Sequence, residues 1–252
     1  MNLLTLARDL RRRKARERQG LFVAEGVRAV EEVLRSGLAI RGALVSDALR
    51  ETPRGAALLT QLEQRNIATL EVGEADFQTA AETDSPQGVL TIGAAPDLDL
   101  ASVPVAESLR LLVLDAVQDP GNAGTILRTA AALGAAATVA MPGTVDLWNA
   151  KVVRSAMGAH FHHSCLTSTW DELDSFRQQH AVEIWAADAE GELVDRLTPP
   201  ARLALVVGNE GAGLSSHARA RADRLVALPI SAAVESLNVA VATGILLYEL
   251  RG

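Results

Sequence analysis

The sequence has little cysteine, few aromatic residues and no long apolar run, and each shortage excludes a class of protein. Cys165 is the only cysteine, which excludes an intramolecular disulfide and leaves too few thiols for a cysteine-based zinc site. Aromatic residues make up 3% of the chain, too few for a platform that stacks unpaired bases. No uncharged apolar run reaches the roughly 18 residues of a membrane span, and the first apolar stretch precedes its basic run, the reverse of a secretory signal. We therefore expect a cytoplasmic protein.

The basic residues are concentrated near the start of an acidic chain. The net charge is −7, yet residues 8–18 hold seven Lys or Arg against two acids, whereas residues 19–95 hold six basic and eleven acidic side chains. Such a cluster is typical of a local phosphate contact. The predicted contacts are Arg11, Arg12, Arg13 and Lys14, and a solvated helix face is the alternative interpretation.

The apolar pattern divides the chain into two α/β domains joined by a linker. With 48% of its 252 residues hydrophobic, the chain can form one core of about 90 residues and one of about 150. Strands and helices alternate in both parts, which predicts a small α/β domain at 1–95 and a mostly parallel sheet covered on both faces at 109–252. Residues 96–108 are interpreted as the linker. The predicted strands lie at 22–24, 40–46, 67–72, 88–92, 111–114, 137–141, 182–187, 203–207 and 225–228, and the predicted helices at 27–34, 56–65, 74–81, 150–157, 237–250 and from 125 onward.

Two loops in the last quarter of the chain have the composition of a ligand site. The apolar run at 203–207 breaks into GNEGAG at 208–213, and a later run leads to SLN at 236–238. Glycines let the backbone approach a ligand or take positive φ, so we predict that the two loops meet around a small molecule. A side chain added at Gly208 is expected to enter this site and leave the fold intact. Two ordinary turns are the alternative.

A third segment, at 111–134, leads to a helix that carries an arginine. Its turn, DPGN at 119–122, follows a predicted strand, and Asn122 and Thr125 are candidate caps of the helix. Arg128 would then lie in about the first turn, where the helix dipole disfavours a cation. This arginine is either a solvated surface residue or is held there to meet a phosphate.

Together these segments resemble the three ordered motifs of the SpoU/TrmH class of SPOUT RNA 2'-O-methyltransferases. The resemblance covers about residues 110–250, in the family's order and spacing: Asn122 with Arg128, the loop at 208–213, and LPI at 228–230 followed by SLN. VRSAMGAHF at 153–161 is similar to a linking element of the family, with Ser155 and Ala156 in swapped order. The first domain, with its basic helix, Glu25-Gly26 and SPQG at 85–88, resembles the small substrate-binding domain of many members.

The resemblance implies a fold, a cofactor and partners. The first domain would be an α/β/α sandwich that binds RNA, and the second would thread its C-terminal segment through a loop to form a trefoil knot, which sequence physics alone would not propose. The knotted loops would hold S-adenosylmethionine, and a homodimer would place each active site near the partner subunit. The small first domain favours 23S rRNA as the substrate.

The same resemblance implies roles for individual residues. The residues expected to hold the cofactor are Gly208, Asn209, Gly213, Leu228, Ile230 and Leu237. The residues expected to serve catalysis are Asn122, Arg128, Glu210, Ser236 and Asn238, with Arg128 also holding an RNA phosphate and with purely structural roles for the two asparagines as an alternative. A neutral guanidine at Arg128 is disfavoured as the base because the pKa of arginine is high, so Glu210 or a phosphate is the preferred proton acceptor.

Other functions explain fewer of these features. A tRNA 2'-O-methyltransferase and a non-catalytic RNA-binding protein are the alternatives, but the second leaves the catalytic set without a purpose. A nicotinamide-dependent oxidoreductase needs Gly-x-Gly-x-x-Gly after a strand near the start of its domain, whereas residues 208–213 read Gly-x-x-Gly-x-Gly. A metal held by His160, His162 and His163 is disfavoured because no ligand pattern completes it, so we expect no metal, with the last two histidines ending a strand at the surface.

Overall fold

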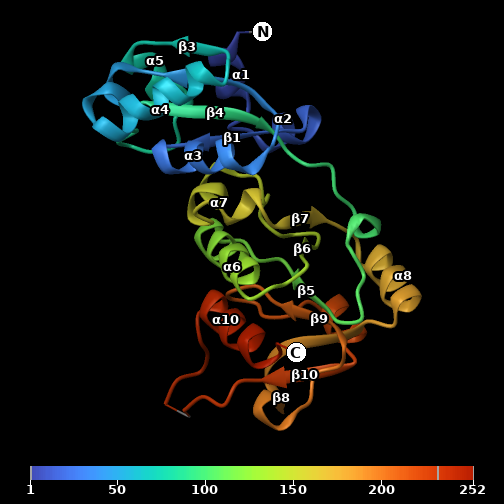
Figure 1. Ribbon diagram of the computed structural model, residues 1–252. Coiled ribbons are helices and arrows are strands. Elements are labelled where there is room, and N and C mark those ends of the chain that lie inside the picture. Colours follow the sequence, from blue (N-terminus) through green and yellow to red (C-terminus); the bar gives the residue numbers. More distant parts are fainter. Residues whose placement is uncertain (1, 232, 252) are drawn as a thin grey trace. The chain divides into compact units, whose positions relative to one another are not determined.

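The computed structural model describes residues 2–231 and 233–251, and the chain forms two compact units (Figure 1). The first unit comprises the residues up to Asp97 together with Trp148–Phe161, and the second comprises Leu98–Leu147 and the residues from His162 onward. Residues 148–161 therefore interrupt the second unit along the sequence but belong to the first unit in space. Within the predicted linker, Leu100 and Val103 are buried in the core of the second unit; the predicted boundaries themselves stay a prediction.

The first unit is a four-stranded sheet with helices on both faces. Its strands are β1 (Leu21–Glu25), β2 (Ile40–Val45), β3 (Thr69–Glu71) and β4 (Val89–Ala94), in the order β1-β4-β2-β3 with β4 antiparallel to both neighbours. Its helices are α1 (Leu3–Asp9), α2 (Arg13–Gln19), α3 (Val27–Ser36), α4 (Pro53–Gln64), α5 (Glu74–Ala80) and α7 (Ala150–Ser155).

The pleat of this sheet explains its two cores. Along β4, Leu90 and Ile92 pack against α1 and α5, whereas Val89 packs in the cluster that contains residues of α3 and α4. Successive side chains of a strand point to opposite faces, so an apolar strand needs cover on both sides. The α/β/α sandwich predicted for this unit is confirmed.

The second unit is built on a six-stranded, wholly parallel sheet. Its strands are β5 (Leu109–Leu114), β6 (Ala137–Ala140), β7 (Ser164–Thr167), β8 (Glu183–Leu193), β9 (Arg202–Val207) and β10 (Arg224–Ala227), in the order β10-β8-β9-β5-β6-β7. Its helices are α6 (Pro120–Ala132), α8 (Trp170–His180), α9 (Ser216–Arg221) and α10 (Val239–Glu249). The strand order reverses between β5 and β9, which places a crevice at the carboxyl ends of the strands there. The predicted parallel sheet is confirmed, and the trefoil knot stays a prediction.

Helix α6 begins earlier than the sequence analysis predicted. Its N-cap is Asp119, whose Oδ1 accepts the N–H of Asn122 at 2.7 Å, and Pro120 is its first residue. Proline is well suited to that position because it has the φ of a helix and no N–H to satisfy. The predicted caps, Asn122 and Thr125, were wrong. Arg128 is the ninth residue of α6, so the argument that it opposes the helix dipole in the first turn was wrong too.

Besides α1, the sequence analysis missed β7, α8 and α9, which lie between residues 164 and 221. Strand β7 has four residues and α9 has six, too few for a clear apolar period. Helix α8 did carry a signal, because Trp170, Leu173 and Phe176 recur at helical spacing behind a Thr169–Glu172 capping box. Helix α10 packs against α6, where a Cβ on Gly244 would lie 3.3 Å from Cγ2 of Thr129. No helix in the described part of the chain is long and apolar enough to span a membrane.

Candidate functional site

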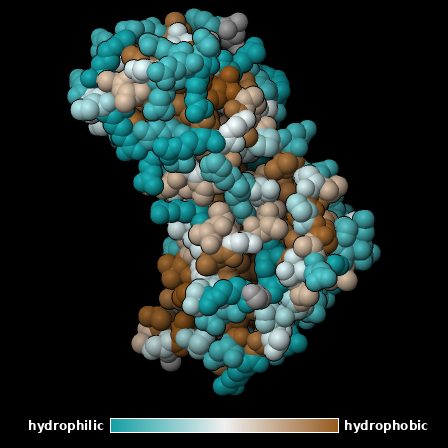
Figure 2. All heavy atoms as spheres, in the orientation of Figure 1, coloured by the Kyte–Doolittle hydropathy of each residue, from teal (hydrophilic) through white to brown (hydrophobic). Residues whose placement is uncertain are grey.

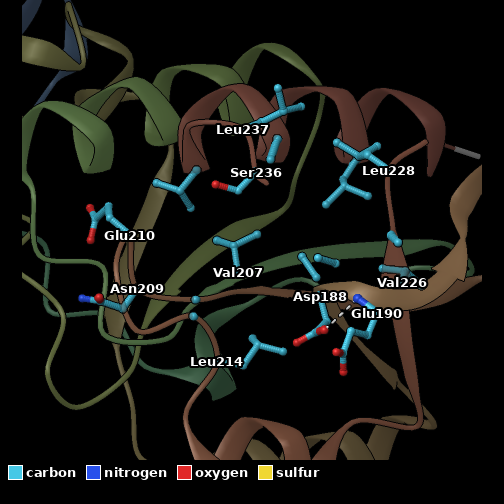
Figure 3. A pocket seen from close by; sticks show the side chains of 18 of the residues that line it. Asp188, Glu190, Val207, Asn209, Glu210, Leu214, Val226, Leu228, Ser236 and Leu237 are labelled. Carbon is cyan, nitrogen blue, oxygen red and sulfur yellow. Dashed lines mark hydrogen bonds between the residues drawn. The ribbon is translucent and has the colours of Figure 1, made fainter. Parts of the chain in front are cut away.

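A cavity of about 540 Å³ lies at the carboxyl ends of β8, β9 and β10 (Figure 3). Its walls are formed by residues 187–190 of β8, by the loops that follow β9 and β10, and by the start of α10. All the residues predicted to hold the cofactor line it, namely Gly208, Asn209, Gly213, Leu228, Ile230 and Leu237, and so do Glu210 and Ser236. The two loops that the sequence analysis placed around a small molecule therefore do meet.

The loop at 208–213 is held in shape by its own asparagine. Asn209 and Gly213 exchange two backbone hydrogen bonds of 2.9 and 3.0 Å, and Oδ1 of Asn209 accepts the N–H groups of Gly211 and Ala212, each at 2.9 Å. Its Nδ2 donates to the carbonyl of Ala116 at 2.8 Å. These bonds fix the loop before any ligand arrives, so the wall of the cavity is preorganised.

Gly208 is required by the packing of the loop on itself. A Cβ at this position would lie 2.5 Å from the carbonyl carbon of Gly213 and 2.7 Å from the backbone nitrogen of Leu214. Backbone atoms cannot move aside as a flexible side chain can, so a substitution would displace the loop. A side chain at 208 would therefore push on the backbone of its own loop as well as on the site, and the expectation that the fold stays intact remains a prediction.

Three predicted catalytic residues form one chain of hydrogen bonds. Nδ2 of Asn238 donates to Oδ1 of Asn122 at 3.0 Å, and Nδ2 of Asn122 donates to Oε1 of Glu210 at 3.1 Å. Asn238 also caps α10 by accepting the N–H of Ala240 at 2.9 Å. The polar residues of all three motifs thus tie together the starts of α6 and α10 and the loop after β9. We call this series of hydrogen bonds, Asn238–Asn122–Glu210, the relay.

The carboxylate of Glu210 is a hydrogen-bond acceptor for the loop before α6. It accepts the backbone N–H groups of Gln118 at 3.1 Å and Asp119 at 3.0 Å, besides the amide of Asn122. Partial burial acts to raise its pKa, but these hydrogen bonds to the charged form prevail and the pKa is lowered. A carboxylate with a lowered pKa and occupied oxygens is a poor proton acceptor, which disfavours Glu210 as the base.

Arg128 stands apart from this arrangement. It is exposed on α6, it is not among the residues that line the cavity, and it forms no ion pair among the described residues. Asn122 and Asn238 also lie outside the lining, although the relay connects them to it. Of the five predicted catalytic residues, only Glu210 and Ser236 face the cavity of their own chain.

The charged groups that line the cavity are mostly acidic. They are Asp188, Glu190, Glu210 and Glu235, against the single guanidinium of Arg219. Asp188 forms an ion pair with Arg219, and its Oδ1 accepts the N–H of Glu190 at 3.0 Å (Figure 3). Of the charged lining residues, the sequence analysis predicted Glu210 and missed Asp188, Glu190, Arg219 and Glu235. The signal was the acidic stretch at 188–190, because it lies in the strand next to β9 and the ends of adjacent parallel strands meet.

The basic run of the first unit is largely neutralised by carboxylates. Arg11 pairs with Glu82 at 3.4 Å, Arg13 pairs with Glu17 at 2.6 Å, and Arg12 pairs with Asp9. Lys14 forms no ion pair among the described residues. Exposed ion pairs are worth at most about 1 kcal/mol, so the arginines can still exchange partners.

The histidines do not end a strand at the surface as predicted. His163 precedes β7 and is largely buried, with Nε2 2.8 Å from Oγ1 of Thr138, and burial lowers its pKa to about 4. Cys165 is also buried, which raises the pKa of its thiol to about 12. The described residues contain no group of three His, Cys, Asp or Glu side chains arranged to hold a metal ion.

Comparison with known proteins relates both units to RNA-modifying enzymes. The chain matches the model of the SpoU rRNA Methylase family over residues 110–248 and that of the MRM3-like substrate binding domain over residues 5–91. It is 36% identical over 250 residues to 23S rRNA (guanosine(2553)-2'-O)-methyltransferase RlmP of Bacillus subtilis (strain 168), which covers 97% of this chain and 94% of that protein. It is 31% identical over 252 residues to 23S rRNA (uridine(2479)-2'-O)-methyltransferase of Streptomyces viridochromogenes, over 94% and 84% of the two chains.

Solved structures give the same relationship. An AdoMet-bound rRNA methyltransferase from Sinorhizobium meliloti has a TM-score of 0.85 and 29% identity, covering 98% of this chain and 93% of that one. The SpoU methyltransferase AviRb of Streptomyces viridochromogenes, in complex with AdoMet, has a TM-score of 0.86 and 28% identity, covering 99% and 97%. A structure concerned with 2-OH methylation of C/U34 on tRNA covers 57% of this chain, with a TM-score of 0.52 and 28% identity.

Proposed function

The chain belongs to the SpoU rRNA methylase family, and we propose that this S-adenosylmethionine-dependent RNA 2'-O-methyltransferase modifies a ribose of 23S rRNA in the cytoplasm. The observation that carries the proposal is the cavity in which the loops of two family motifs meet and to which the relay joins the third. Relatives whose names specify 23S rRNA match along nearly the whole chain, whereas the tRNA-related structure covers little more than half of it, which favours rRNA over tRNA.

The cavity fits S-adenosylmethionine in size and in charge. A volume of about 540 Å³ lies within the usual range for small-molecule sites. S-adenosylmethionine carries a positive sulfonium and a positive amino group, so a lining of four carboxylates and one guanidinium favours it over a dinucleotide with an anionic pyrophosphate. When bound, the cofactor supplies an electrophilic methyl group. We assign its apolar contacts to Leu228, Ile230 and Leu237, and its backbone contacts to Gly208, Asn209 and Gly213.

The protein's own contribution to the reaction is alignment. The relay fixes the loops that carry Glu210 and Ser236, so the ribose and the cofactor meet a rigid wall. Ser236 lines the cavity and supplies a hydroxyl that can hold the target ribose. Because the oxygens of Glu210 are occupied, we assign the proton of the 2'-hydroxyl to an RNA phosphate or to water.

Arg128 holds a phosphate of the RNA in this proposal, and a homodimer brings it to the reaction. It is exposed and outside the cavity of its own chain, so we propose that it serves the cavity of a second protomer. The support is an apolar face on α10, where Val241 and Tyr248 are each 52% exposed and Ile245 is 40% exposed. Figure 2 shows hydrophobic surface over this part of the second unit. Such a patch on a soluble surface marks an interaction site.

The first unit supplies RNA binding. Its match to a substrate binding domain supports this assignment, as does the basic run at 8–18. Within the predicted contacts, Lys14 has no carboxylate partner among the residues that the structure describes, and Arg11, Arg12 and Arg13 would have to exchange carboxylates for phosphates. We therefore propose the run as a secondary contact.

Two measurements on purified protein test the function. Calorimetry should show binding of S-adenosylmethionine and none of NAD, and incubation of 23S rRNA with methyl-labelled cofactor should place the label on a ribose 2'-oxygen. Digestion with alkali distinguishes the sites, because a 2'-O-methyl group blocks cleavage of the adjacent phosphodiester. Label on a base, or binding of NAD in place of S-adenosylmethionine, would refute the proposal.

A further inference from the structure

A second cavity lies wholly within the first unit, and three separate segments line it. Its volume is about 260 Å³, and its walls come from residues 25–29 at the start of α3, from the loop before β4 and from the end of α7. The side chains that line it include Arg28, Ser85, Gln87, Arg154 and Met157. The motifs SPQG at 85–88 and VRSAMGAHF at 153–161 do not line the cavity of the second unit, so that cavity does not explain them.

Glycines and hydrogen bonds fix the shape of this cavity. Gly26 takes φ +95°, and the N–H of the next residue, Val27, donates to Oε1 of Gln87 at 2.9 Å. Gly158 takes φ +91° and lets the chain approach α3, where a Cβ would lie 2.5 Å from Cγ of Glu32. The buried carboxylate of Glu25 accepts the N–H of Glu82 at 2.7 Å, so this carboxylate already has a hydrogen-bond partner within the wall of the cavity. The cavity is therefore a built feature with a set shape.

The cavity presents positive charge that the protein leaves unpaired. Nη1 of Arg154 is buried and has no hydrogen-bond partner among the described residues. Arg28 forms no ion pair among those residues either, although on the same helix Glu31 pairs with Arg54 at 2.6 Å and Glu32 pairs with Arg35 at 2.8 Å. A buried donor without a partner costs free energy, so an arginine kept in this state calls for an acceptor that arrives from outside.

The start of α3 adds neutral donors to the same wall. The N-cap of this ten-residue helix, Gly26, has no side chain, and Gln87 accepts the first N–H, that of Val27. Gly26, Arg28 and Ala29 line the cavity at the first turn of the helix. The free N–H groups and the dipole of a helix N-terminus favour an anion. Two guanidinium groups, a helix N-terminus and the hydroxyl of Ser85 together match the acceptors of a phosphate group.

We propose that this cavity binds one nucleotide of the substrate RNA, with its phosphate held by Arg28 and Arg154. The proposal rests on the proposed function for the existence of an RNA substrate, and it names where the first unit holds that RNA. The volume exceeds the need of a phosphate alone, and Ala29 and Met157 give the remainder an apolar wall for the attached ribose or base. Proteins that recognise RNA commonly bind single nucleotides that are splayed out of the stack, and an arginine plane can cover such a base.

Filter-binding titrations at several salt concentrations test the site, with a 23S rRNA transcript as the probe. Arg154→Gln and Arg28→Gln should each weaken binding about tenfold, because each removes a charge-assisted contact. Each should also lower the log–log salt slope by roughly one unit or less. Arg35→Gln is the matched control, since Arg35 lies on the same helix as Arg28 and already has a carboxylate partner, Glu32. S-adenosylmethionine affinity should stay unchanged in all three variants.

Several outcomes would overturn this site. Wild-type affinity and slope in folded Arg154→Gln and Arg28→Gln would do so, as would an equal loss in Arg35→Gln. Circular dichroism checks the fold, and if Arg154→Gln is unfolded the exposed Arg28 decides alone. The proposed function is judged separately, by methyl transfer of the wild type: transfer without any effect of the two variants refutes only the site, whereas an effect on RNA binding without wild-type transfer refutes only the function.

Discussion

Each unit contains one of these two cavities, and their walls are made of different groups. In the second unit the wall consists of backbone loops and apolar side chains, with four carboxylates and one arginine as its charged groups. In the first unit the wall carries two arginines that have no carboxylate partner among the described residues. It also carries the buried carboxylate of Glu25, which already accepts the backbone N–H of Glu82. A cationic cofactor suits the first kind of wall, and a phosphate suits the second. If both proposals hold, the chain separates its two ligands by the sign of their charge.

The basic run extends this comparison. It holds seven Lys or Arg in eleven positions, far more than the cavity of the first unit, yet most of its arginines face carboxylates. The cavity has two basic side chains, and neither has a carboxylate partner in the described part of the chain. The number of basic residues in a segment therefore does not measure the charge it offers to RNA, because ion pairs with neighbours already use part of it.

The largest expected effect is that of a residue outside both cavities. Arg128→Ala should lower methyl transfer by about 10²–10³-fold, because it removes a cation near the charge that develops at the ribose. Affinity for S-adenosylmethionine should not change, since Arg128 does not line the cavity. Arg128→Lys should restore part of the activity, because lysine keeps the charge and lacks the planar fork. Single-turnover assays measure this, and full activity in Arg128→Ala would remove Arg128 from the mechanism.

The next effect tests the backbone wall of the second unit. Gly208→Ala should weaken S-adenosylmethionine binding by roughly 5- to 150-fold, because the added methyl group displaces the loop at a cost of about 1–3 kcal/mol. Gly211→Ala is the matched control on the same loop, since the atom of the described structure nearest to its Cβ would be Oδ1 of Asn209 at 3.7 Å. Calorimetry separates the two variants, and equal affinities would show that the close packing at Gly208 does not shape the site.

A smaller effect is the dependence of the free energy of unfolding on pH, which we expect from His163 beside the sheet of the second unit. Burial lowers the pKa of His163 to about 4, so between the unfolded value near 6.5 and this pKa the unfolded chain binds the proton and the folded chain does not. Stability should therefore fall as pH drops through this window, by up to about 3 kcal/mol. Thermal unfolding measures it: His163→Gln should lose this dependence and the exposed His162→Gln should keep it. The same pH dependence in wild type and His163→Gln would contradict the assignment.

The smallest effect is expected from the basic run. Replacing Arg11, Arg12, Arg13 and Lys14 by Ala should flatten the salt slope of RNA binding by about one unit, the share of Lys14, because the three arginines already have carboxylate partners. S-adenosylmethionine binding should be unchanged. A fall of about three units would show that the arginines exchange carboxylates for phosphates, and would make the run the principal RNA contact.

The sequence predicted which loops line the cavity of the second unit because each loop consists of adjacent residues. Glycine spacing and the SLN triplet identify two of its walls without any knowledge of distant contacts. The acidic wall at 188–190 was missed because β8 becomes a neighbour of β9 only through the order of the strands. The close packing of Gly208 on Gly213 was missed for a related reason, since its cause is the three-dimensional turn of the loop.

The cavity of the first unit could not be predicted from spacing at all. Arg28 and Arg154 are 126 positions apart, and α7 packs in the first unit although its sequence lies within the second. Its charge depends on which arginines find a carboxylate, and only the folded chain decides that. The start of α6 was predicted too late because Asn122 and Thr125 are good capping residues in general, while Asp119 followed by Pro120 is the stronger pair.

Ribose-methylation mapping across total RNA tests the central claim most directly. The comparison is between a strain that lacks the gene and the same strain carrying the wild-type or the Arg128→Ala gene. We predict that one 2'-O-methyl group of 23S rRNA disappears with the gene, returns with the wild type and does not return with Arg128→Ala. An unchanged 23S rRNA, or a methyl group lost from tRNA, would contradict the account.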